Sequence, residues 1–389
     1  MTKPLSTVLI GVGGYGALYC NALLNNTIPD LKLTAIVDPY AKSSRLYDRF
    51  KDAIPVYDSL EDFFATGQKA EFTIVSSPIH LHYPQSVTAL ANGSHVFCEK
   101  PLVPNLCQLD LLDEKIAASG KTLHVGFQWC YSSVMQALKA RFISGEFGRP
   151  VCFKNLAPAP RDWEYYGRNN WAGRVKTDDG HIVNDSVASN ATAHYIQNML
   201  FLLGGTMEES AELSNTHIEL YRANDIESFD TCIFRGEAAG ATVFYAASHA
   251  ISDATNTPMR YKLEKAEIII NIFDHAGECI IHHQDGRVEN LGPAMQDGEV
   301  NKLKYAVQSI RGERPIICSA LTARPITALI DVMFKQDVHC FPPEHIVVDS
   351  ANKRTYVKNL HLELEDCFNQ TALPSEIGMS WAMAPARLF

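Results

Sequence analysis

Two charged residues directly after a short apolar segment are the strongest chemical signal in the sequence. The segment His95–Cys98 reads as a buried strand and is followed at once by Glu99-Lys100-Pro101. Proline lacks the N–H group that would continue a β-ladder, so the strand is expected to end there. Charges at the end of an inner strand are costly without partners, and open α/β sheets bind ligands at this edge. We therefore expect Lys100 to face a cofactor bound by the first half of the chain and a substrate held by the second.

A glycine-rich turn near the start of the chain has the spacing of a dinucleotide-binding loop. Gly11–Gly16 satisfies the pattern G-x-G-x-x-G, after the strand-like Thr7–Ile10 and before the helix-like Ala17–Leu24. An acidic residue, Asp38, closes the next strand-like segment, Leu33–Val37. The glycine pattern alone is common, and its specificity comes from the flanking strand, the helix and the acidic residue.

This arrangement is suited to binding NAD. Gly11 allows the tight turn, Gly13 lets the backbone approach a pyrophosphate, and Gly16 lets the helix and strand pack closely. The helix N-terminus offers N–H groups and the positive end of its dipole to the phosphates. Asp38 would hydrogen bond the adenosine ribose and repel a 2′-phosphate, so NAD is favoured over NADP. The alternative is a glycine-rich turn in a doubly wound fold that binds no dinucleotide.

A second candidate for chemistry lies in Val187–Leu203, which is predicted to be a helix. Asn190 and His194 are four residues apart, and this spacing places them on one helical face. The segment follows a long irregular stretch, Ala157–Asp185, that is rich in aromatic and charged residues, and such long loops usually carry function. From spacing alone, a catalytic histidine and a buried structural histidine are equally compatible with this pattern.

The first motifs need a parallel sheet to position them, and the alternation of strand-like and helix-like segments predicts one. The predicted strands are Thr7–Ile10, Leu33–Val37, Ile54–Tyr57, Phe72–Val75, His95–Cys98 and Thr122–Val125. The predicted helices are Ala17–Leu24, Ala41–Lys51, Leu60–Ala65 with Ser59 as its cap, Tyr83–Asn92 and Asn105–Ser119. The loop Ser76-Ser77-Pro78 is suited to passing over a cofactor, whereas His82 either packs or contacts the cofactor. We predict a Rossmann dinucleotide-binding domain over residues 1–125.

Residues 126–389 are predicted to form a second α/β domain, for substrate binding and oligomerisation, with one large, mainly antiparallel or mixed sheet. Its predicted strands are Val151–Leu156, Ala211–Leu220, Thr231–Phe234, Ala241–Ser248, Tyr261–Glu264, Ala266–Phe273 and Glu278–His282. Helices are predicted over Tyr131–Ile143, Val187–Leu203, Lys302–Ile310 and Leu321–Phe334. The last two are expected to pack back toward the first domain. The tail Phe341–Phe389 has no clear pattern.

The composition excludes several classes of partner. A length of 389 residues favours two domains, and a formal charge of −10 argues against nucleic acid and anionic membrane surfaces. No apolar run is long enough to span a membrane, and the N-terminus does not resemble a signal peptide. Ten cysteines without metal-ligand spacing indicate reduced thiols in a cytoplasmic protein. His282-His283 is better explained as a surface pair than as a metal site.

Several motifs occur together in the order found in one known family. They are Gly11–Gly16, Asp38, Ser77-Pro78, Glu99-Lys100-Pro101, the Gly145–Pro150 turn and the His194 helix that ends in Leu203-Gly204. Over residues 5–335 the chain resembles the Gfo/Idh/MocA family of NAD(P)-dependent oxidoreductases, and Glu-Lys-Pro after the fifth strand is its most specific mark. The resemblance implies a Rossmann domain, a second domain with a large open sheet, and a homodimer or homotetramer formed through that sheet. It also implies hydride transfer between NAD and a secondary hydroxyl of a sugar, cyclitol or sugar derivative.

The resemblance assigns residues to roles. Lys100 would be the catalytic lysine and His194 the catalytic histidine, with Asn190 at the position where the family commonly has an aspartate. Asparagine keeps a hydrogen-bonding group but adds no charge, so His194 is expected to be less basic than in the common pattern. The expected cofactor contacts are Gly11, Gly13, Gly14, Tyr15, Gly16, Asp38, Ser76, Ser77, Pro78, His82, Glu99, Lys100 and Gln128. The expected substrate contacts are Lys100, Tyr166, Arg168, Trp171, Asp185, Asn190 and His194.

Two other functions remain open from the sequence. One is a glycoside-cleaving enzyme in which NAD oxidises a sugar hydroxyl transiently and then returns the hydride. The other is a non-catalytic, NAD-binding regulator, against which the presence of both Lys100 and His194 counts. Net release of NADH separates a freely exchanging dehydrogenase from the first alternative, and any hydride transfer excludes the second.

Overall fold

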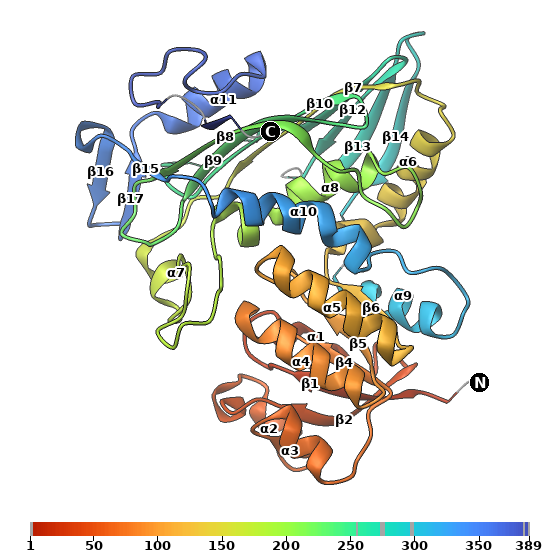
Figure 1. Cartoon of the computed structure of the whole chain (residues 1–389). Helices are drawn as coiled ribbons and strands as arrows, with labels where there is room; N and C mark the ends of the chain where they lie inside the picture. Colours follow the sequence, from red (N-terminus) through yellow and green to blue (C-terminus); the bar gives the residue numbers. More distant parts are fainter. Residues whose placement is uncertain (1–2, 254–255, 273–276, 296–298, 384–385, 388–389) are drawn as a thin grey trace. The chain divides into compact units, whose positions relative to one another are not determined.

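A computed structural model describes residues 3–253, 256–272, 277–295, 299–383 and 386–387 (Figure 1). The chain divides into two compact units. The first unit contains Met1–Tyr131 and Asp297–Arg324, and the second contains Ser132–Gln296 and Pro325–Phe389. The main segment of the first unit thus ends at residue 131, and a later segment that includes helix α9 also belongs to this unit.

The first unit is built on a parallel sheet with the strand order β3-β2-β1-β4-β5-β6, six strands within its described residues. The strands are β1 (Leu5–Ile10), β2 (Leu31–Val37), β3 (Val56–Tyr57), β4 (Phe72–Val75), β5 (His95–Cys98) and β6 (Leu123–Val125). β1, β4 and β5 are almost wholly buried, as expected for inner strands with helices on both faces. The predicted Rossmann sheet is confirmed.

The helices of the first unit follow the prediction with local differences. They are α1 (Gly16–Leu24), α2 (Tyr47–Phe50), α3 (Leu60–Ala65), α4 (Ile79–Ala91), α5 (Leu106–Ser119) and α9 (Asn301–Ile310). Ser59 caps α3 by accepting a hydrogen bond from the Asp62 N–H, as predicted. The single helix predicted over Ala41–Lys51 is wrong, since the 3-10 turn η1 (Ala41–Ser43) and the short α2 replace it.

The second unit contains a mixed sheet of ten strands within the described residues, in the order β14-β13-β12-β11-β7-β10-β9-β8-β15, with β18 paired to β8. The strands are β7 (Pro150–Pro158), β8 (Ser214–Arg222), β9 (Thr231–Ala238), β10 (Ala241–Ser248), β11 (Met259–Leu263), β12 (Ala266–Asn271), β13 (Glu278–His283), β14 (Val288–Pro293), β15 (His339–Cys340) and β18 (Ala386–Arg387). Most pairs are antiparallel, whereas β7 and β10 run parallel. The predicted α/β class with a mainly antiparallel second sheet is confirmed, although β14 was not predicted and Phe273, the predicted end of one strand, lies outside the described residues.

Helices and turns of the second unit modify the predicted pattern in two places. The helices are α6 (Ser133–Ile143), α7 (Trp163–Gly167), α8 (Ala193–Leu202) and α11 (Leu360–Gln370), and α10 (Ala320–Met333) spans the boundary between the units. The long loop therefore contains a short helix, α7. The continuous helix predicted over Val187–Leu203 is wrong, because a π-helical turn, η3 (Val187–Ala191), precedes α8.

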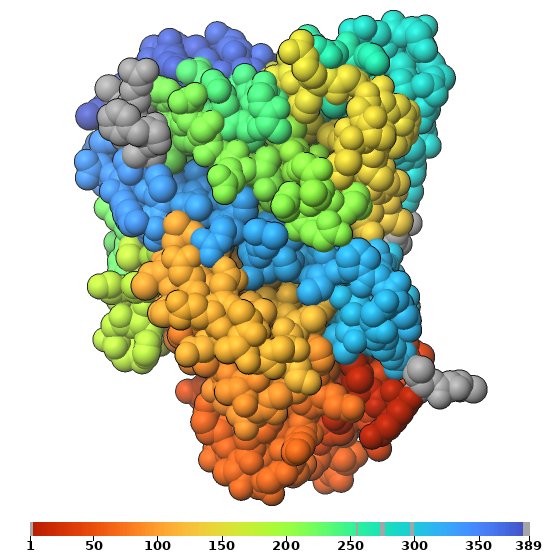
Figure 2. All heavy atoms as spheres, turned by 45° about the vertical axis from the view of Figure 1, so that its right-hand side comes forward, coloured from red at the N-terminus to blue at the C-terminus, as the bar shows by residue number. Residues whose placement is uncertain are grey.

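The sheet of the second unit carries helices on both faces. Lys154 and Asn155 are neighbours in β7, so their side chains point to opposite faces. Asn155 Nδ2 donates to the Tyr195 carbonyl of α8 at 2.7 Å, whereas Lys154 Nζ donates to the Phe368 carbonyl of α11 at 2.8 Å. The C-terminal tail thus covers part of the sheet, and Figure 2 shows its violet-blue segment on the outside of this unit.

The tail is fixed to the sheet by a buried apolar cluster. Trp381 packs edge-on against Tyr221 of β8, with 4.9 Å between the ring centroids, and its Nε1 donates to Glu363 of α11 at 2.8 Å. The tail therefore covers one face of the sheet at β8. The predicted homo-oligomer stays a prediction, and it would have to use the remaining part of the sheet.

Two further expectations concern membranes and metals. Among the described residues, no helix combines the length and the apolar character needed to cross a membrane. His283 Nε2 lies 2.8 Å from Glu289 Oε1, whereas the neighbouring His282 is exposed. Among the described residues, no three or more His, Cys, Asp or Glu side chains lie together so that they could hold a metal ion.

Two histidines in the first sheet are expected to make the stability of the first unit sensitive to acid. His95 Nδ1 and His124 Nε2 both contact Thr122 Oγ1, at 2.8 and 3.2 Å. Burial lowers the pKa of His95 to about 4 and that of His124 to about 3. Unfolded histidines titrate near a pKa of about 6.5, so between these values the native state binds fewer protons. The contribution of these two histidines to the free energy of unfolding is therefore complete above about pH 6.5. It is lost as the pH falls through the folded pKa values.

We expect His124→Gln to reduce this loss in the first unit. Hydrogen exchange of the amides in residues 122–125, followed from pH 7 to 4, compares the variant with the wild type. Each proton that the unfolded state binds and the folded state does not lowers the free energy of unfolding by about 1.4 kcal/mol per unit of falling pH. The amides of the wild type should therefore lose protection more steeply than those of the variant. His282→Gln, at an exposed position in the second unit, is the control. Equal slopes for the wild type and His124→Gln would contradict the prediction.

Candidate functional site

The glycine loop of the first unit requires glycine at two positions. Gly11 has a φ of +82°, and a Cβ atom there would lie 2.5 Å from the Ser76 carbonyl oxygen. A Cβ atom on Gly16 would lie 2.1 Å from the Gly11 carbonyl oxygen, because α1 begins against the loop. Gly13 instead faces open space, with no atom within 4 Å of a Cβ placed there. The loop is therefore tightly packed on one side and open at Gly13, where a pyrophosphate can approach the backbone.

Asp38 and the glycine loop are held together. The Asp38 carboxylate accepts a hydrogen bond from the Val12 N–H at 2.9 Å and another from the Tyr40 N–H at 2.8 Å. Ser44 Oγ donates to the Val12 carbonyl at 2.9 Å. A pocket of about 340 Å³ opens beside them, lined by Val12, Gly13, Gly14, Ala17, Ser43, Ser44 and Arg45. Its glycine backbone and its position at the start of α1 fit the phosphates of a dinucleotide.

The carboxyl ends of three neighbouring strands bring the loops together. Ile10 of β1 lies opposite Val75 of β4, which lies opposite Cys98 of β5. The residues that follow, including Gly11, Ser76 and Glu99, therefore leave the sheet at one edge. With about 4.8 Å between adjacent strands, the glycine loop and Glu99-Lys100-Pro101 are roughly 10 Å apart across the sheet.

Glu99 is the centre of a buried network. Its carboxylate is 7 % exposed and lies 2.7 Å from Nζ of Lys302, which is 0 % exposed and belongs to α9. Tyr19 of α1 donates a short hydrogen bond to the same oxygen, and Lys302 Nζ also reaches Tyr15 Oη at 3.2 Å. Burial lowers the pKa of Lys302 while the Glu99 carboxylate acts in the opposite direction.

Lys302 was not identified from the sequence. It lies 203 residues after Glu99, in a predicted helix with no motif of its own, and the only signal available was a helix expected to pack back on the first domain. A Cβ atom on Gly126 would lie 2.7 Å from the Glu99 carboxyl group, so a glycine is also needed beside the ion pair. Direct contact of Glu99 with a cofactor stays a prediction, since its Oε1 is engaged by Tyr19 and Lys302 and its Oε2 lies 3.2 Å from the Lys100 N–H.

The other predicted cofactor residues also contact one another. Tyr15 Oη donates to Gln128 Oε1 at 2.8 Å, which joins two residues 113 positions apart. His82 is 2 % exposed, and its two ring nitrogens contact the carbonyls of Ser77 and Pro101 at 2.9 and 2.8 Å. The geometry favours the packing role for His82, because it links two loops at the sheet edge and has neither nitrogen turned to solvent. Lys100 is half-buried at the same edge.

In the second unit, Asp185 organises the predicted catalytic segment. It is buried, and its carboxylate accepts hydrogen bonds from Asn190 Nδ2 at 2.8 Å and from the Gly173 N–H at 2.7 Å. Asn190 belongs to the π-helical turn η3, a type of turn that is frequent at functional sites. His194 is half-buried in the first turn of α8. A buried carboxylate is therefore held one side chain away from Asn190.

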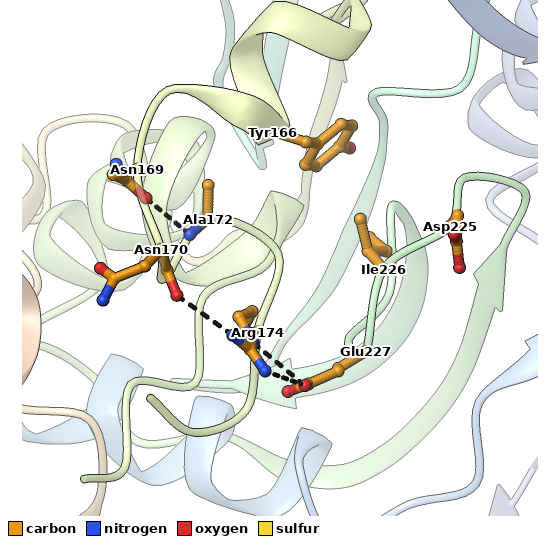
Figure 3. Close-up of a pocket in the computed structure, with 8 residues that line it drawn as sticks. All are labelled: Tyr166, Asn169, Asn170, Ala172, Arg174, Asp225, Ile226 and Glu227. Carbon is orange, nitrogen blue, oxygen red and sulfur yellow. Dashed lines mark hydrogen bonds and ion pairs between the residues drawn. The ribbon is translucent and has the colours of Figure 1, made fainter. Parts of the chain in front are cut away.

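The long loop forms a pocket with the turn between β8 and β9 (Figure 3). The pocket has a volume of about 360 Å³ and is lined by Tyr166, Asn169, Asn170, Ala172, Arg174, Asp225, Ile226 and Glu227. Arg174 is fixed on one side by Glu227 at 3.0 Å and by Asp178 at 2.7 Å. The pocket thus offers amide and carboxylate groups that suit the hydroxyls of a polar ligand. Trp171 and Arg168, which belong to the same loop, do not line it.

A buried histidine behind this loop was missed from the sequence. His249 follows β10, is 2 % exposed and lies with its Nδ1 3.1 Å from Tyr166 Oη. Burial lowers the pKa of His249 well below its usual value, and the nearby Arg161 and Arg168 add to this effect. Because His249 ends an ordinary strand pattern 83 residues after Tyr166, no local sequence signal points to this pairing.

Comparison with known proteins identifies the first unit. Residues 5–127 match the Gfo/Idh/MocA family model, described as an oxidoreductase family with an NAD-binding Rossmann fold. Residues 5–127 are an NAD-binding domain of the Gfo/Idh/MocA family. The match ends four residues before the boundary of the compact unit, so the NAD-binding domain and the main segment of the first unit nearly coincide.

The curated relatives share part of the chain at low identity. The scyllo-inositol 2-dehydrogenase (NAD(+)) of Bacillus subtilis is 26% identical over 160 residues, which cover 40% of this chain and 45% of the relative. An inositol 2-dehydrogenase of Rubrobacter xylanophilus is 24% identical over 209 residues, which cover 54% of this chain and 55% of the relative. The matched segment thus spans about half the length of these relatives.

Solved structures show the same fold over most of the chain. The WlbA dehydrogenase from Bordetella pertussis, in complex with NADH and UDP-GlcNAcA, superposes with a TM-score of 0.69 at 19% identity and covers 86% of this chain and 96% of its own. An oxidoreductase from Agrobacterium radiobacter in complex with NAD⁺ gives a TM-score of 0.69 at 16% identity and covers 91% of this chain and 98% of its own. At this identity the likeness shows the fold, which thus extends beyond the NAD-binding domain.

Substitutions at Glu99 and Lys302 are expected to have strongly coupled effects on the stability of the first unit. Lys302→Met should destabilise the first unit by about 3–5 kcal/mol, because it leaves the Glu99 carboxylate buried without its cation. The double variant Glu99→Gln/Lys302→Met removes both charges and should lose less than the sum of the two single variants. Denaturant unfolding, followed by hydrogen exchange of peptides from the first unit, measures both effects.

An exposed ion pair in the same unit is the control. Lys51 pairs with Asp48 at 2.6 Å, with side-chain exposures of 39% and 87%. Lys51→Met should therefore leave the stability of the first unit nearly unchanged. Additive losses in the double variant, within about 0.5 kcal/mol, would show that Glu99 and Lys302 do not form a coupled pair.

Proposed function

We propose that the chain is an NAD-dependent oxidoreductase that transfers a hydride between the nicotinamide and a secondary hydroxyl of a sugar, cyclitol or sugar derivative. The observation that carries this proposal is the position of Lys100. It follows β5 at the edge of the parallel sheet where the glycine loop of an NAD-binding domain also leaves β1. An ammonium group at this edge is suited to a reaction in which negative charge develops on a substrate oxygen.

The cofactor contacts belong to the first unit. Gly13 and the start of α1 would hold the pyrophosphate, and Asp38 would accept hydrogen bonds from the adenosine ribose. Asp38 also holds Val12 and Tyr40, so the acidic group is fixed beside the pocket before any ligand arrives. NAD, when bound, accepts or supplies the hydride.

Lys100 and His194 are proposed to act on the reacting hydroxyl. Lys100 would donate a hydrogen bond to the substrate oxygen and stabilise its developing negative charge. His194 would accept the hydroxyl proton, a step that typically contributes about 10²–10⁴-fold. Asn190 would hold the substrate or the imidazole through its amide. Its bond to Asp185 fixes the orientation of that amide, because Nδ2 faces the carboxylate and Oδ1 therefore points away from it.

The substrate class rests on the relatives and on the loop. The curated relatives are named as inositol dehydrogenases, whose reaction is the oxidation of a ring hydroxyl. Tyr166, Asn169 and Asn170 line a pocket with the ring and amide groups that commonly bind sugars and cyclitols. Trp171 and Arg168 stay candidates for contacts with the substrate.

Lys100→Met tests the proposal. The variant should lose at least about 10³-fold in turnover, because no other ammonium replaces the transition-state contact, while NAD affinity changes less than about threefold. Turnover is followed by nicotinamide absorbance over a panel of neutral sugars, cyclitols, uronates and sugar phosphates. NAD affinity is measured by calorimetric titration of the same preparations.

A lysine on the solvent face of α5 is the matched control. Lys115 is exposed, and Lys115→Met removes one positive charge from the same unit. It should leave both turnover and NAD affinity unchanged. Normal turnover in Lys100→Met would refute the role of this lysine, and absence of hydride transfer over the whole panel in the wild type would refute the proposed function.

A further inference from the structure

Three nitrogen-bearing side chains gather around one tyrosine ring in the second unit. The Arg168 guanidinium lies 3.6 Å from the centroid of the Tyr165 ring, and the Arg161 guanidinium lies 4.8 Å from it. The His249 ring is 5.3 Å from the same centroid, in an edge-on arrangement. These residues come from the loop after β7 and from the end of β10, two strands that run parallel and end at one edge. We refer to Arg161, Arg168 and His249 as the Tyr165 cluster.

The two arginines of the Tyr165 cluster have no carboxylate partner among the residues that the structure describes. This separates them from Arg174 in the same loop, which pairs with Asp178 and Glu227. Two guanidinium groups within 5 Å of the same ring centroid repel each other, and an anion close to both would offset this repulsion. Stacking on Tyr165 fixes both groups in place without neutralising either charge.

The nearby acids are engaged elsewhere. Asp185 accepts hydrogen bonds from Gly173 and Asn190. Asp230 is fully buried and accepts hydrogen bonds from the Ala223 and Asn224 N–H groups and from the Asn224 side chain. Their carboxylates are therefore held by other donors.

His249 adds a buried polar atom to the cluster. Its Nδ1 contacts Tyr166 Oη, whereas its Nε2 is buried and has no hydrogen-bond partner in the described part of the chain. Nε of Arg161 is likewise buried and has no hydrogen-bond partner in the described part of the chain. Buried donors without partners are costly, so two of them beside one ring indicate a place prepared for an acceptor. When Tyr166 donates to Nδ1, Nε2 carries the proton and can donate.

The cluster is connected to the loop pocket by Tyr166. The ring of this tyrosine lines the pocket in Figure 3, while its hydroxyl group contacts His249. The pocket offers Asn169 and Asn170 for neutral hydroxyls, and Arg168 immediately precedes them in the chain. A sugar ring in the pocket and a charged substituent at the arginines would thus use one continuous segment of the loop.

We propose that the Tyr165 cluster binds an anionic substituent, a carboxylate or a phosphate, on the sugar or cyclitol substrate. This inference rests on the proposed function for the identity of the substrate and deepens it by selecting acidic sugars over neutral ones. Guanidinium groups donate paired hydrogen bonds to planar carboxylates and to phosphates, which a hydroxyl group cannot match. Losing such a charge-assisted contact weakens binding by about 10- to 100-fold.

Calorimetric titration of the NAD-bound protein tests the proposal. The probes are neutral hexoses and cyclitols, the matching uronates, and the matching monophosphates. At least one anionic probe should bind about 10-fold or more tightly than its neutral parent. A preference confined to the uronates identifies a carboxylate as the natural group, and one confined to the monophosphates identifies a phosphate.

Two variants distinguish anion binding at the Tyr165 cluster from a general effect of positive charge on the second unit. Arg161→Met/Arg168→Met should abolish the preference, so that the variant binds the anionic probe no more tightly than its neutral parent. Arg149→Met removes a positive charge from an exposed side chain of the same unit and should leave the preference intact. Neutral probes that bind as tightly as every anionic one, no binding by any anionic probe, or a preference that survives in the double variant would each overturn the proposal.

The readout is independent of catalysis. Hydride transfer to NAD is recorded separately with the same probes. Arginine-dependent binding of an anion without hydride transfer would leave the Tyr165 cluster in place and refute the proposed function. Turnover of neutral sugars without an arginine-dependent preference would support the proposed function and refute the anionic site.

Discussion

The buried carboxylate of Glu99 is the constraint on which the first unit depends. An ionised group at the end of an inner strand needs a cation and hydrogen-bond donors, and α9 supplies Lys302 while α1 supplies Tyr19. This one ion pair joins β5, the dinucleotide-binding helix and a helix from the far end of the sequence. It also separates the two charges of the motif, because Glu99 is satisfied inside the unit and Lys100 is left half-buried at the sheet edge.

A similar principle fixes the loop of the second unit. Asp185 holds Gly173 and Asn190, and the Gly173 carbonyl in turn accepts the N–H groups of Glu227 and Ser228. One buried carboxylate thus ties the loop to the turn before β9 and to the π-helical turn before α8. The amide of Asn190 is itself bound to an aspartate, so a negative charge lies one side chain away from it.

The extent to which the sequence predicts the structure depends on the range of the interactions. The glycine loop, Asp38 and Glu99-Lys100-Pro101 were predictable because each is a local strand-and-turn signal on a parallel sheet. Lys302 was not, since a lysine in an amphipathic helix carries no sign of a partner 203 residues away. The π-helical turn was missed because periodicity cannot reveal one inserted residue. His249 was missed because its strand pattern continues normally up to the residue before it.

The C-terminal tail covers part of the second sheet. On β7, one face packs against α8 and the other against α11, and the apolar cluster of the tail also includes residues of β8, β9 and β10. On β12 and β13 the outward residues Ile269 and Ile280 are paired across the strands and only partly buried. Close by, Arg260 and Glu267 form a half-exposed ion pair. An interface through this sheet would therefore combine a small apolar centre with charged groups. Its charged contacts would fix the orientation of the two copies, whereas the apolar area that it buries would be small.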